Sequence, residues 1–437
     1  MEKVIDMYAE IISEFLHTDK EKVKEHMLYA RDTFHIPIKY YANHQLFYCN
    51  SDEELAGYEK QLTESRIQYE KRLSDITGKT PDEAKEYMTT TCASCHITGK
   101  EILDGELYKM TPEEIVQWKA AKKARADARV KRLMEKSGKD EAFIRKHMAK
   151  CKCIFGIAMG EYESTRCYEL SDEKLSTYAN LEDSRRLRAK YITVDDEVLT
   201  NKILFNKTYK EFLGRDYWVN EHTSYEEFAR FIDGKEEVFC KPIDLHGALG
   251  VYKVKVEKDT KKLYDDFMAQ PKLLVEELLC QHPAMSSFYS KSINTVRVFT
   301  ILKDDVFDAF AAFVRFGKDG IADNISAGGI GCGVDEKTGK IITPAIGMDG
   351  ILYEKHPVSG KEFLGFQIPF WNEILTTCEK ALRKVPGVNF AGFDVAITKD
   401  GIAIVEGNCI PCLSIYQSFF AYKYQGRKYK YEKYLKD

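Results

Sequence analysis

The chain has 437 residues, which is too long for one ordinary hydrophobic core, so we expect two or more domains. Its 65 Lys and Arg against 69 Asp and Glu give a net charge of −4, which offers no electrostatic support for a nucleic-acid-binding protein. No membrane span is expected, because the longest apolar stretch, residues 306–314, is interrupted by Asp308 and is too short.

The first twenty residues read as a helix, because their apolar residues recur at helical spacing and no basic stretch precedes an apolar one. We therefore expect no signal peptide and a cytoplasmic protein, in which the 12 cysteines stay reduced.

Three tandem copies of a unit of about 60 residues are recognisable in the first half of the chain. Tyr48, Tyr108 and Tyr168 lie at the same position of each copy, three residues before SDEEL, TPEEI or SDEKL. These segments have the Ser/Thr and Glu pattern of helix starts. We expect the repeated tyrosines to pack between neighbouring copies, since an aromatic at fixed register usually fills such a core.

The copies occupy about residues 1–70, 71–130 and 131–195, and each predicts about two helices and a turn. Copies of this kind bury one another's apolar faces, so residues 1–195 are expected to form an all-α array. In the absence of a catalytic motif, we expect such an array to serve as a scaffold that could recruit a protein partner.

Residues 92–96 read CASCH, the C-x-x-C-H spacing of covalent haem attachment, and these thiols and imidazole also suit zinc. In the other two copies the positions of Cys95 and His96 are occupied by Phe-His at 34–35 and Phe-Gly at 155–156. A shared haem or metal site could not tolerate these changes, so we expect no haem. Ordinary thiols are favoured, and the alternative is a structural metal held by Cys92, Cys95, Cys151 or Cys153.

From about residue 196 the sequence changes to alternating strands and turns, which predicts a second domain over 196–437. Residues 238–256 read as a strand reaching Lys241, a turn with Gly247 and Gly250, and a second strand. The main-chain amides of such a turn can contact phosphates, and a strand-held lysine can meet them as a point charge.

A second hairpin is predicted over residues 393–408, FDVAITKDGIAIVEGN, with Asp394 on its first strand. Glu406 and Asn408 are two residues apart on the other strand and therefore share a face, with Asp394 opposite. Three oxygen ligands in this arrangement suit Mg²⁺ that bridges nucleotide phosphates. A solvent-facing acidic hairpin is the alternative.

Together with SINTVRVFT (292–300) and ADNISAGGIGCGVD (322–335), these segments resemble the ATP-grasp superfamily. The nearest resemblance is to its sugar-transfer-associated branch, found with capsule and surface-polysaccharide genes, and it covers about residues 196–425. It implies an α+β architecture of antiparallel sheets and helices with the nucleotide between two lobes. The implied parts are a small lobe at about 202–275, a hinge at 276–279 and a large lobe at about 280–437.

The resemblance, together with the turn that carries Gly247 and Gly250, implies four groups of site residues. ATP would be contacted by Lys202, Lys241, Gly247, Gly250, Glu276, Glu277 and Leu279. The metal ligands for Mg²⁺ would be Asp394, Glu406 and Asn408. Charge on the transferred phosphoryl group would be stabilised by the catalytic residues Arg297, Arg315 and Lys241. The acceptor side would be formed by Asn294, Asp323 and Asn324.

The implied reaction is an ATP-dependent, ADP-forming ligation in which a carboxylate becomes an acyl phosphate and is captured by an amine. The substrates would be small and sugar-linked, in surface-glycan or sugar-conjugate biosynthesis. One alternative is an ATP-grasp phosphotransferase that acts on a hydroxyl. Another is a nucleotide-binding scaffold that recruits a glycan-synthesis partner through the repeats.

Several nearby features are not expected to carry the chemistry. His246 and His282 read as loop or packing histidines, and the C-x-x-C pair Cys409 and Cys412 lacks the helix start of a redox motif. Many relatives carry Arg just before the aspartate ligand, whereas Gly and Phe stand there in this chain. The Tyr- and Lys-rich tail, 422–437, is expected to pack on the domain rather than to bind a polyanion.

Overall fold

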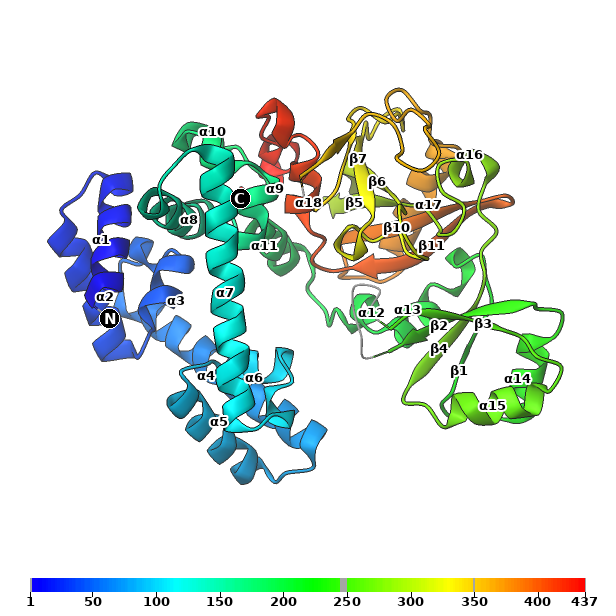
Figure 1. Cartoon of the computed structure of the whole chain (residues 1–437), viewed down its shortest axis with the longest axis horizontal. Coiled ribbons are helices and arrows are strands. Elements are labelled where there is room, and N and C mark those ends of the chain that lie inside the picture. The colour runs from blue at the N-terminus through cyan, green and yellow to red at the C-terminus, as the bar shows by residue number, and fades with distance from the viewer. Residues whose placement is uncertain (1, 244–249, 349, 437) are drawn as a thin grey trace. The chain divides into compact units, whose positions relative to one another are not determined.

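A computed structural model describes residues 2–243, 250–348 and 350–436 (Figure 1). Contacts divide the chain into two compact units, Met1–Met159 and Gly160–Asp437. The expected architecture is confirmed in outline, since an all-helical N-terminal region precedes antiparallel sheets. The boundary lies earlier than the one expected near residue 196, because residues 160–195 belong to the second unit.

The first unit is built from helices. They are α1 (Glu2–Leu16), α2 (Lys20–Phe34), α3 (Ile38–Asn43), η1 (Leu46–Tyr48), α4 (Asp52–Thr77), α5 (Pro81–Cys95), α6 (Gly99–Asp104), η2 (Leu107–Lys109), α7 (Pro112–Ser137) and α8 (Glu141–Phe155). Helices α2, α5 and α8 each span 15 residues. Side-chain caps start several of these helices, and Thr80 and Thr111 form full capping boxes at α5 and α7.

The ends of α2, α5 and α8 explain the histidine of the CASCH segment. The residue after each helix has a left-handed backbone: φ is 53° at His35, 49° at His96 and 68° at Gly156. Glycine adopts this conformation without cost, and histidine is enriched there among other residues. His96 therefore ends a helix, and its position repeats because the same turn repeats.

The cysteines next to this cap are half-buried thiols. Cys92 and Cys95 pack at the edge of the cluster around Ile102 and Leu107, and burial raises the pKa of the Cys92 thiol. Among the residues that the structure describes, no three His, Cys, Asp or Glu side chains are arranged to hold a metal ion.

The repeated tyrosines differ in burial, which corrects one expectation. Tyr168 is 8% exposed, but Tyr48 is 52% exposed and therefore does not fill a core. The fully buried residue of each turn is instead Leu46, Leu107 or Cys167. The predicted packing position thus lies one or two residues before the tyrosine.

The second unit combines helices with two antiparallel sheets. Its helices are α9 (Met159–Ser164), η3 (Cys167–Glu169), α10 (Asp172–Ser176), α11 (Leu181–Tyr191), α12 (Glu197–Thr200), α13 (Lys202–Thr208), η4 (Lys210–Phe212), α14 (Tyr225–Ile232), α15 (Thr260–Met268), α16 (Pro283–Ser286), η5 (Ile325–Ala327), α17 (Trp371–Arg383), α18 (Leu413–Ser418), η6 (Ala421–Lys423), η7 (Lys428–Lys430) and α19 (Glu432–Leu435). Its strands are β1 (Tyr217–Val219), β2 (Glu237–Pro242), β3 (Tyr252–Lys255), β4 (Leu273–Glu277), β5 (Thr295–Lys303), β6 (Val306–Phe316), β7 (Ile330–Val334), β8 (Ala345–Ile346), β9 (Leu352–Tyr353), β10 (Phe390–Thr398) and β11 (Gly401–Asn408).

The smaller sheet has the strand order β1-β4-β2-β3 (Figure 1). Its core lies between the sheet and two helices, and it contains Trp218 of β1, Phe228 of α14 and Phe267 of α15. In β2, Val238 and Cys240 are buried in this core, so Lys241 projects from the opposite face because strand residues alternate.

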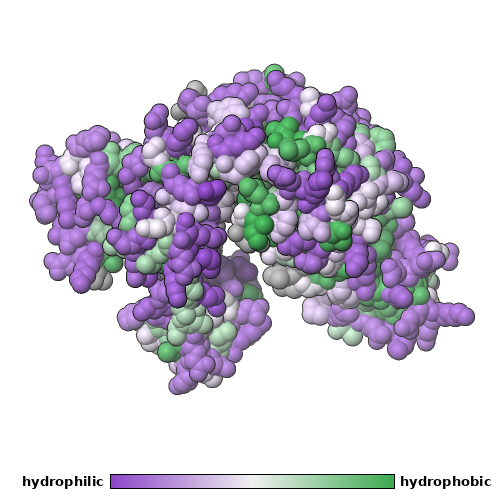
Figure 2. Space-filling view, turned by 45° about the horizontal axis from the view of Figure 1, so that its top comes forward, coloured by the Kyte–Doolittle hydropathy of each residue, from purple (hydrophilic) through white to green (hydrophobic). Residues whose placement is uncertain are grey.

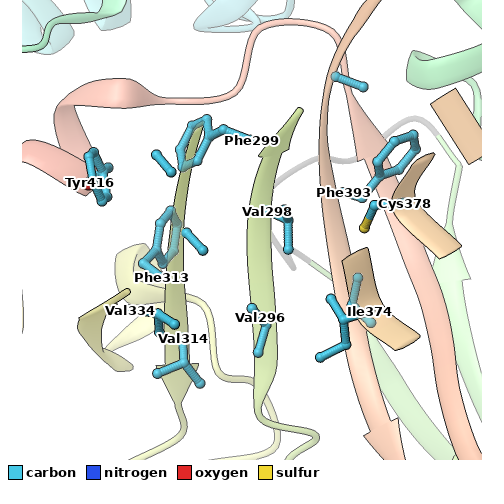
Figure 3. Close-up of a cluster of buried hydrophobic side chains, with 14 of the residues drawn as sticks. Val296, Val298, Phe299, Phe313, Val314, Val334, Ile374, Cys378, Phe393 and Tyr416 are labelled. Carbon is cyan, nitrogen blue, oxygen red and sulfur yellow. The ribbon is translucent and has the colours of Figure 1, made fainter. Parts of the chain in front are cut away.

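The larger sheet has the order β11-β10-β5-β6-β7-β8-β9. On one face Val296 and Val298 pack near Ile374 of α17, whereas the other face carries Phe299 beside Tyr416 of α18 (Figure 3). Since Arg297 and Phe299 are two residues apart on β5, Arg297 points to the face of Phe299. This alternation places the charged residues described below on one side of the sheet.

Among the described residues, no helix is both long and apolar enough to cross a bilayer. The face seen in Figure 2 is mostly hydrophilic, with smaller separate hydrophobic patches.

Candidate active site

Three neighbouring strands bring together one aspartate, one glutamate and one arginine. In the strand register, Asp394 of β10 lies opposite Arg297 of β5 and opposite Glu406 of β11. Residues that lie directly opposite one another project from the same face of a sheet. The predicted hairpin geometry of Asp394 and Glu406 is therefore present, and Arg297 extends it by one strand.

Asp394 is fully buried between two arginines. Its Oδ2 accepts hydrogen bonds from Nη2 of Arg297 and Nη2 of Arg315, each at 2.7 Å, and its Oδ1 accepts from Nε of Arg297. Burial alone would raise the pKa of Asp394, but the two guanidinium groups hold it well below its usual value. Asp394 thus fixes two cations at one point of the sheet.

Glu406 is the accessible carboxylate of this cluster. Its Oε1 lies 3.5 Å from Nη2 of Arg297, and 53% of its side-chain surface is exposed. Desolvation of the carboxyl group and the neighbouring charge of Asp394 raise the pKa of Glu406 despite this exposure. Asn408 follows on the same face and donates from Nδ2 to the carbonyl oxygen of Gly392 at 3.4 Å.

Asp323 and Thr295 orient Arg315. Oδ2 of Asp323 accepts from the main-chain N of Thr295 at 2.8 Å and from its Oγ1 at 2.5 Å, and it lies 3.4 Å from Nε of Arg315. The Thr295 hydroxyl also accepts from Nη2 of Arg315 at 2.6 Å. Asp323 was predicted on the acceptor side, and the structure places it behind an arginine.

Asn324 follows Asp323 and caps the short helix η5. Its Oδ1 accepts from the main-chain N of Ser326 at 3.0 Å. The turn closes so tightly that a Cβ on Gly329 would overlap the carbonyl oxygen of Asp323, which explains a glycine here. The exposed residues 326–328 lie at the tip of this loop.

Asn294 is a core residue, which corrects its predicted place on the acceptor side. It is fully buried, and its Nδ2 donates to the carbonyl oxygens of Met285 at 3.0 Å and Tyr289 at 2.9 Å. Its Oδ1 accepts from Gly317 N at 3.1 Å and from Ser292 Oγ at 3.4 Å. All four hydrogen-bonding positions of the amide are used inside the protein, so none remains for a substrate.

A second charged cluster surrounds Glu276 on β4. Oε2 of Glu276 lies 2.5 Å from Nζ of Lys241, and its Oε1 accepts from Nη2 of Arg215 at 2.7 Å and from Nδ2 of Asn206 at 2.9 Å. Burial alone would raise the pKa of Glu276, but the charges of Arg215 and Lys241 hold it well below its usual value. The predicted ATP contact Glu276 is therefore a carboxylate that is 2% exposed and already has three partners inside the protein.

Arg215 connects the two clusters and was missed in the sequence. Besides Glu276, it donates to the main-chain oxygens of Ile404 at 3.1 Å and Val405 at 3.2 Å. Val405 directly precedes Glu406, so Arg215 ties the strand of Glu406 to the residue that holds Lys241. The only signal for it in the sequence is an arginine just before the strand at 217–219, which is too common to be diagnostic.

The remaining predicted ATP contacts lie around the β2–β3 hairpin and the hinge. Nζ of Lys202 donates to the carbonyl oxygen of Ile243 at 2.9 Å, at the start of the turn that Lys241 precedes. Gly250 has φ 69°, a conformation that favours glycine, whereas Gly247 and His246 lie outside the described residues.

The hinge offers main-chain rather than side-chain groups. Glu277 is half-buried, and its Oε2 accepts from the main-chain N of Asp216 at 3.2 Å. Within the described parts of the chain, the main chains of Leu278 and Leu279 make no hydrogen bond. Their main-chain N–H and C=O groups are therefore open to a further hydrogen-bonding partner.

The donor set at the sheet edge fits Mg²⁺. Glu406 and Asn408 offer a carboxylate and an amide oxygen on one face, which are the oxygen ligands that Mg²⁺ prefers. Asp394 already accepts from two arginines and would contribute only its remaining lone pairs. The fit therefore rests mainly on Glu406 and Asn408.

Comparison with known families gives a match over part of the chain. Residues 259–422 match the family model described as sugar-transfer associated ATP-grasp, so the predicted recognition of this branch is confirmed for that segment. No curated protein matches the chain.

Solved structures show weaker similarity. D-alanyl-alanine synthetase A from Vibrio cholerae is 11% identical with a TM-score of 0.33, over 55% of this chain and 64% of that protein. An L-amino acid ligase from Bacillus licheniformis is 11% identical with a TM-score of 0.32, over 50% of this chain and 43% of that one. N5-carboxyaminoimidazole ribonucleotide synthetase from Thermotoga maritima is 13% identical with a TM-score of 0.30, over 50% of this chain and 44% of that one. This chain thus spans less than two thirds of each.

Proposed function

We propose, from the premise that residues 259–422 are a sugar-transfer associated ATP-grasp segment, that this protein is an ATP-dependent ligase. It would convert a substrate carboxylate to an acyl phosphate with release of ADP, and an amine would then capture the acyl group. The acid would be a small molecule, sugar-linked or a sugar acid, as in surface-glycan or sugar-conjugate biosynthesis.

The observation that carries the proposal is the pairing of Arg297 and Arg315 on Asp394 next to the exposed Glu406. Two guanidinium groups with fixed positions can bind the oxygens of a phosphoryl group and stabilise charge that develops there. Because Asp394 and Asp323 hold these arginines before substrate arrives, little reorganisation is needed when the charge forms.

Lys241 and Lys202 have complementary roles in this proposal. Lys241 is oriented by Glu276, and Lys202 is held at the carbonyl oxygen of Ile243 at the start of the β2–β3 turn. Their ammonium groups would contact the α- and β-phosphates as point charges. The free main chain at Leu278 and Leu279 would bind the adenine ring.

Glu406 and Asn408, with Asp394 behind them, would hold Mg²⁺. When bound, the ion neutralises phosphate charge and polarises the phosphoryl group toward the attacking carboxylate. No side-chain nucleophile is required, because the carboxylate oxygen of the substrate attacks the γ-phosphorus and ADP leaves. The amine then attacks the acyl carbon and phosphate leaves.

The test is ADP release from MgATP with hydroxylamine as a trap for acyl phosphates, across a panel of uronic acids and amino acids. We expect one acid to stimulate ADP release and to give a hydroxamate. Glu406→Gln should lower both rates by about 100-fold or more, since catalytic electrostatic groups carry effects of this size. Glu379→Gln is the matched control, because among the described residues Glu379 pairs with Arg383 alone, on the surface of α17.

The other outcomes separate the alternatives. A stable phosphorylated hydroxyl compound without hydroxamate would identify a phosphotransferase. Binding of MgATP without turnover for any compound of a broad panel would contradict the ligase and favour a nucleotide-binding scaffold.

A further inference from the structure

A surface cavity of about 770 Å³ lies in the second unit, between the end of α10 and the C-terminal segment 423–432. The two segments meet closely, because Lys428 N donates to the carbonyl oxygen of Thr177 at 3.0 Å. A Cβ on Gly426 would overlap Thr177, which explains a glycine at this contact. The tail thus packs on the domain, as the sequence predicts, and forms a concave surface in doing so.

Cations dominate the lining of this cavity. They are Lys174, Lys423, Arg427 and Lys428, and among the described residues Glu432 is the one acidic residue that lines it. Lys428 lies 3.3 Å from Asp183, and Glu432 lies 3.5 Å from Lys436, so these two have partners of their own. Within the described chain, Lys174, Lys423 and Arg427 form no ion pair with a carboxylate.

Arg427 is the unusual member, because it is 7% exposed and has no acidic partner in the part of the chain described. Its Nε and Nη2 donate to the hydroxyl of Tyr416 at 3.1 and 2.7 Å, and the guanidinium lies 3.9 Å from the ring centre of Phe420. These contacts fix the guanidinium group, but among the described residues no carboxylate neutralises its charge. A buried charge without a counter-ion is costly, and the cost falls when an anion binds.

We propose that this cavity binds a phosphorylated small molecule at a site separate from the ATP site. A phosphoryl group would be held by Arg427, Lys423 and Lys174, since a dianion matches several unpaired cations better than a single carboxylate does. Tyr424 and Tyr429, which also line the cavity, would contact a sugar or base ring.

The shape and size favour a small ligand over a macromolecule. A concave site of 770 Å³ lies within the range of small-molecule pockets, whereas a membrane surface or nucleic acid is bound by an extended basic face. None of the lining residues belongs to the proposed ATP site, so the two sites can be tested independently.

The test is calorimetric titration of the full chain with inorganic pyrophosphate and with glucose 1-phosphate. It is done in a Lys241→Ala background without Mg²⁺, which weakens phosphate binding at the ATP site. We expect both probes to bind, and the double variant Lys174→Glu/Lys423→Glu to weaken their Kd at least tenfold. Lys258→Glu, on the surface of the small lobe, is the matched control and should change Kd less than twofold.

The test uses variants of the exposed Lys174 and Lys423, because a variant of the buried Arg427 can fail to fold. Equal affinity in the double variant, or no binding of either probe, would overturn the proposal. Binding to phosphatidylserine vesicles or to a short RNA, with no binding of the soluble phosphates, would also overturn it. Failure of the ATP turnover assay would leave this test unaffected.

Discussion

Glu276 holds two cations that come from distant parts of the sequence, Arg215 and Lys241. Both ends of this network matter for the proposed site, since Lys241 is a proposed phosphate contact and Arg215 binds the strand next to Glu406. Removing one member of a buried ion pair leaves its partner without compensation, which costs about 3–5 kcal/mol.

We therefore expect Glu276→Gln to lower the free energy of unfolding by about 3 kcal/mol at pH 7. The native pKa of Glu276 is lowered from its ordinary 4.5, so its stabilising contribution is present above that pH and is lost as the pH falls below it. The difference between wild type and variant should thus shrink by about 1.4 kcal/mol per pH unit below that value. Urea unfolding at pH 7, 4 and 3 measures it.

Glu277→Gln is the control for this experiment. Glu277 lies beside Glu276 but is half-buried, and within the described ranges its carboxylate accepts one main-chain hydrogen bond, from Asp216. Its effect should stay within about 1 kcal/mol. A difference for Glu276→Gln that does not change between pH 7 and pH 3 would contradict the assigned network.

At the scale of elements, the end of α5 bears on whether His96 is a metal ligand or a helix cap. A left-handed backbone costs a residue with a side chain about 1–2 kcal/mol relative to glycine. The equivalent position of α8 already carries glycine, with φ 68° at Gly156.

His96→Gly should therefore raise the stability of the first unit by about 1 kcal/mol, and Gly156→Ala should lower it by a similar amount. Thermal unfolding in buffer with and without a chelator measures both effects. The opposite result would identify the histidine as a metal ligand: His96→Gly would lower stability, and zinc would stabilise the wild type but not the variant.

The pairing of the strands determines which residues come together at the proposed site. Asp394 meets Arg297 and Glu406 because β10 lies between β5 and β11. The hairpin partner Glu406 is close in sequence, whereas Arg297 is 97 residues away.

At the scale of the whole molecule, the division of the chain predicts which fragment folds. Leu187 and Tyr191 of α11 belong to the core of the large sheet, and Asn389 N donates to the carbonyl oxygen of Tyr191 at 2.9 Å. A cut at residue 195 removes this helix, whereas a cut after Met159 keeps it.

We expect the fragment 160–437 to unfold cooperatively and to bind MgATP with an affinity within about threefold of the full chain, because its core is intact. The fragment 196–437 should aggregate or bind 8-anilinonaphthalene-1-sulfonate (ANS), since loss of α11 exposes apolar surface of the core. Circular dichroism, size-exclusion chromatography and nucleotide titration compare the two. A stable, nucleotide-binding fragment 196–437 would contradict this boundary.

The sequence by itself determined features that depend on local spacing. Period-two alternation and a short turn are enough to place Asp394 across from Glu406, and capping residues are enough to start α5 and α7. The same holds for the recurrence of a turn at His35, His96 and Gly156, which is visible as aligned positions in three copies.

The tertiary structure alone decided which polar groups were already occupied. Asn294 and Glu276 have the residue types of a substrate or nucleotide contact, but burial and hydrogen bonding commit them to the core. Arg215 and Arg427 gain their significance only from distant partners, or from the lack of an acidic one among the described residues. The contacts of Arg215 with Glu276 and Ile404 join segments far apart in the chain, and short-range sequence patterns carry no information about them. The free energy of a buried charge depends on every group packed around it, and these groups are known only once the chain is folded.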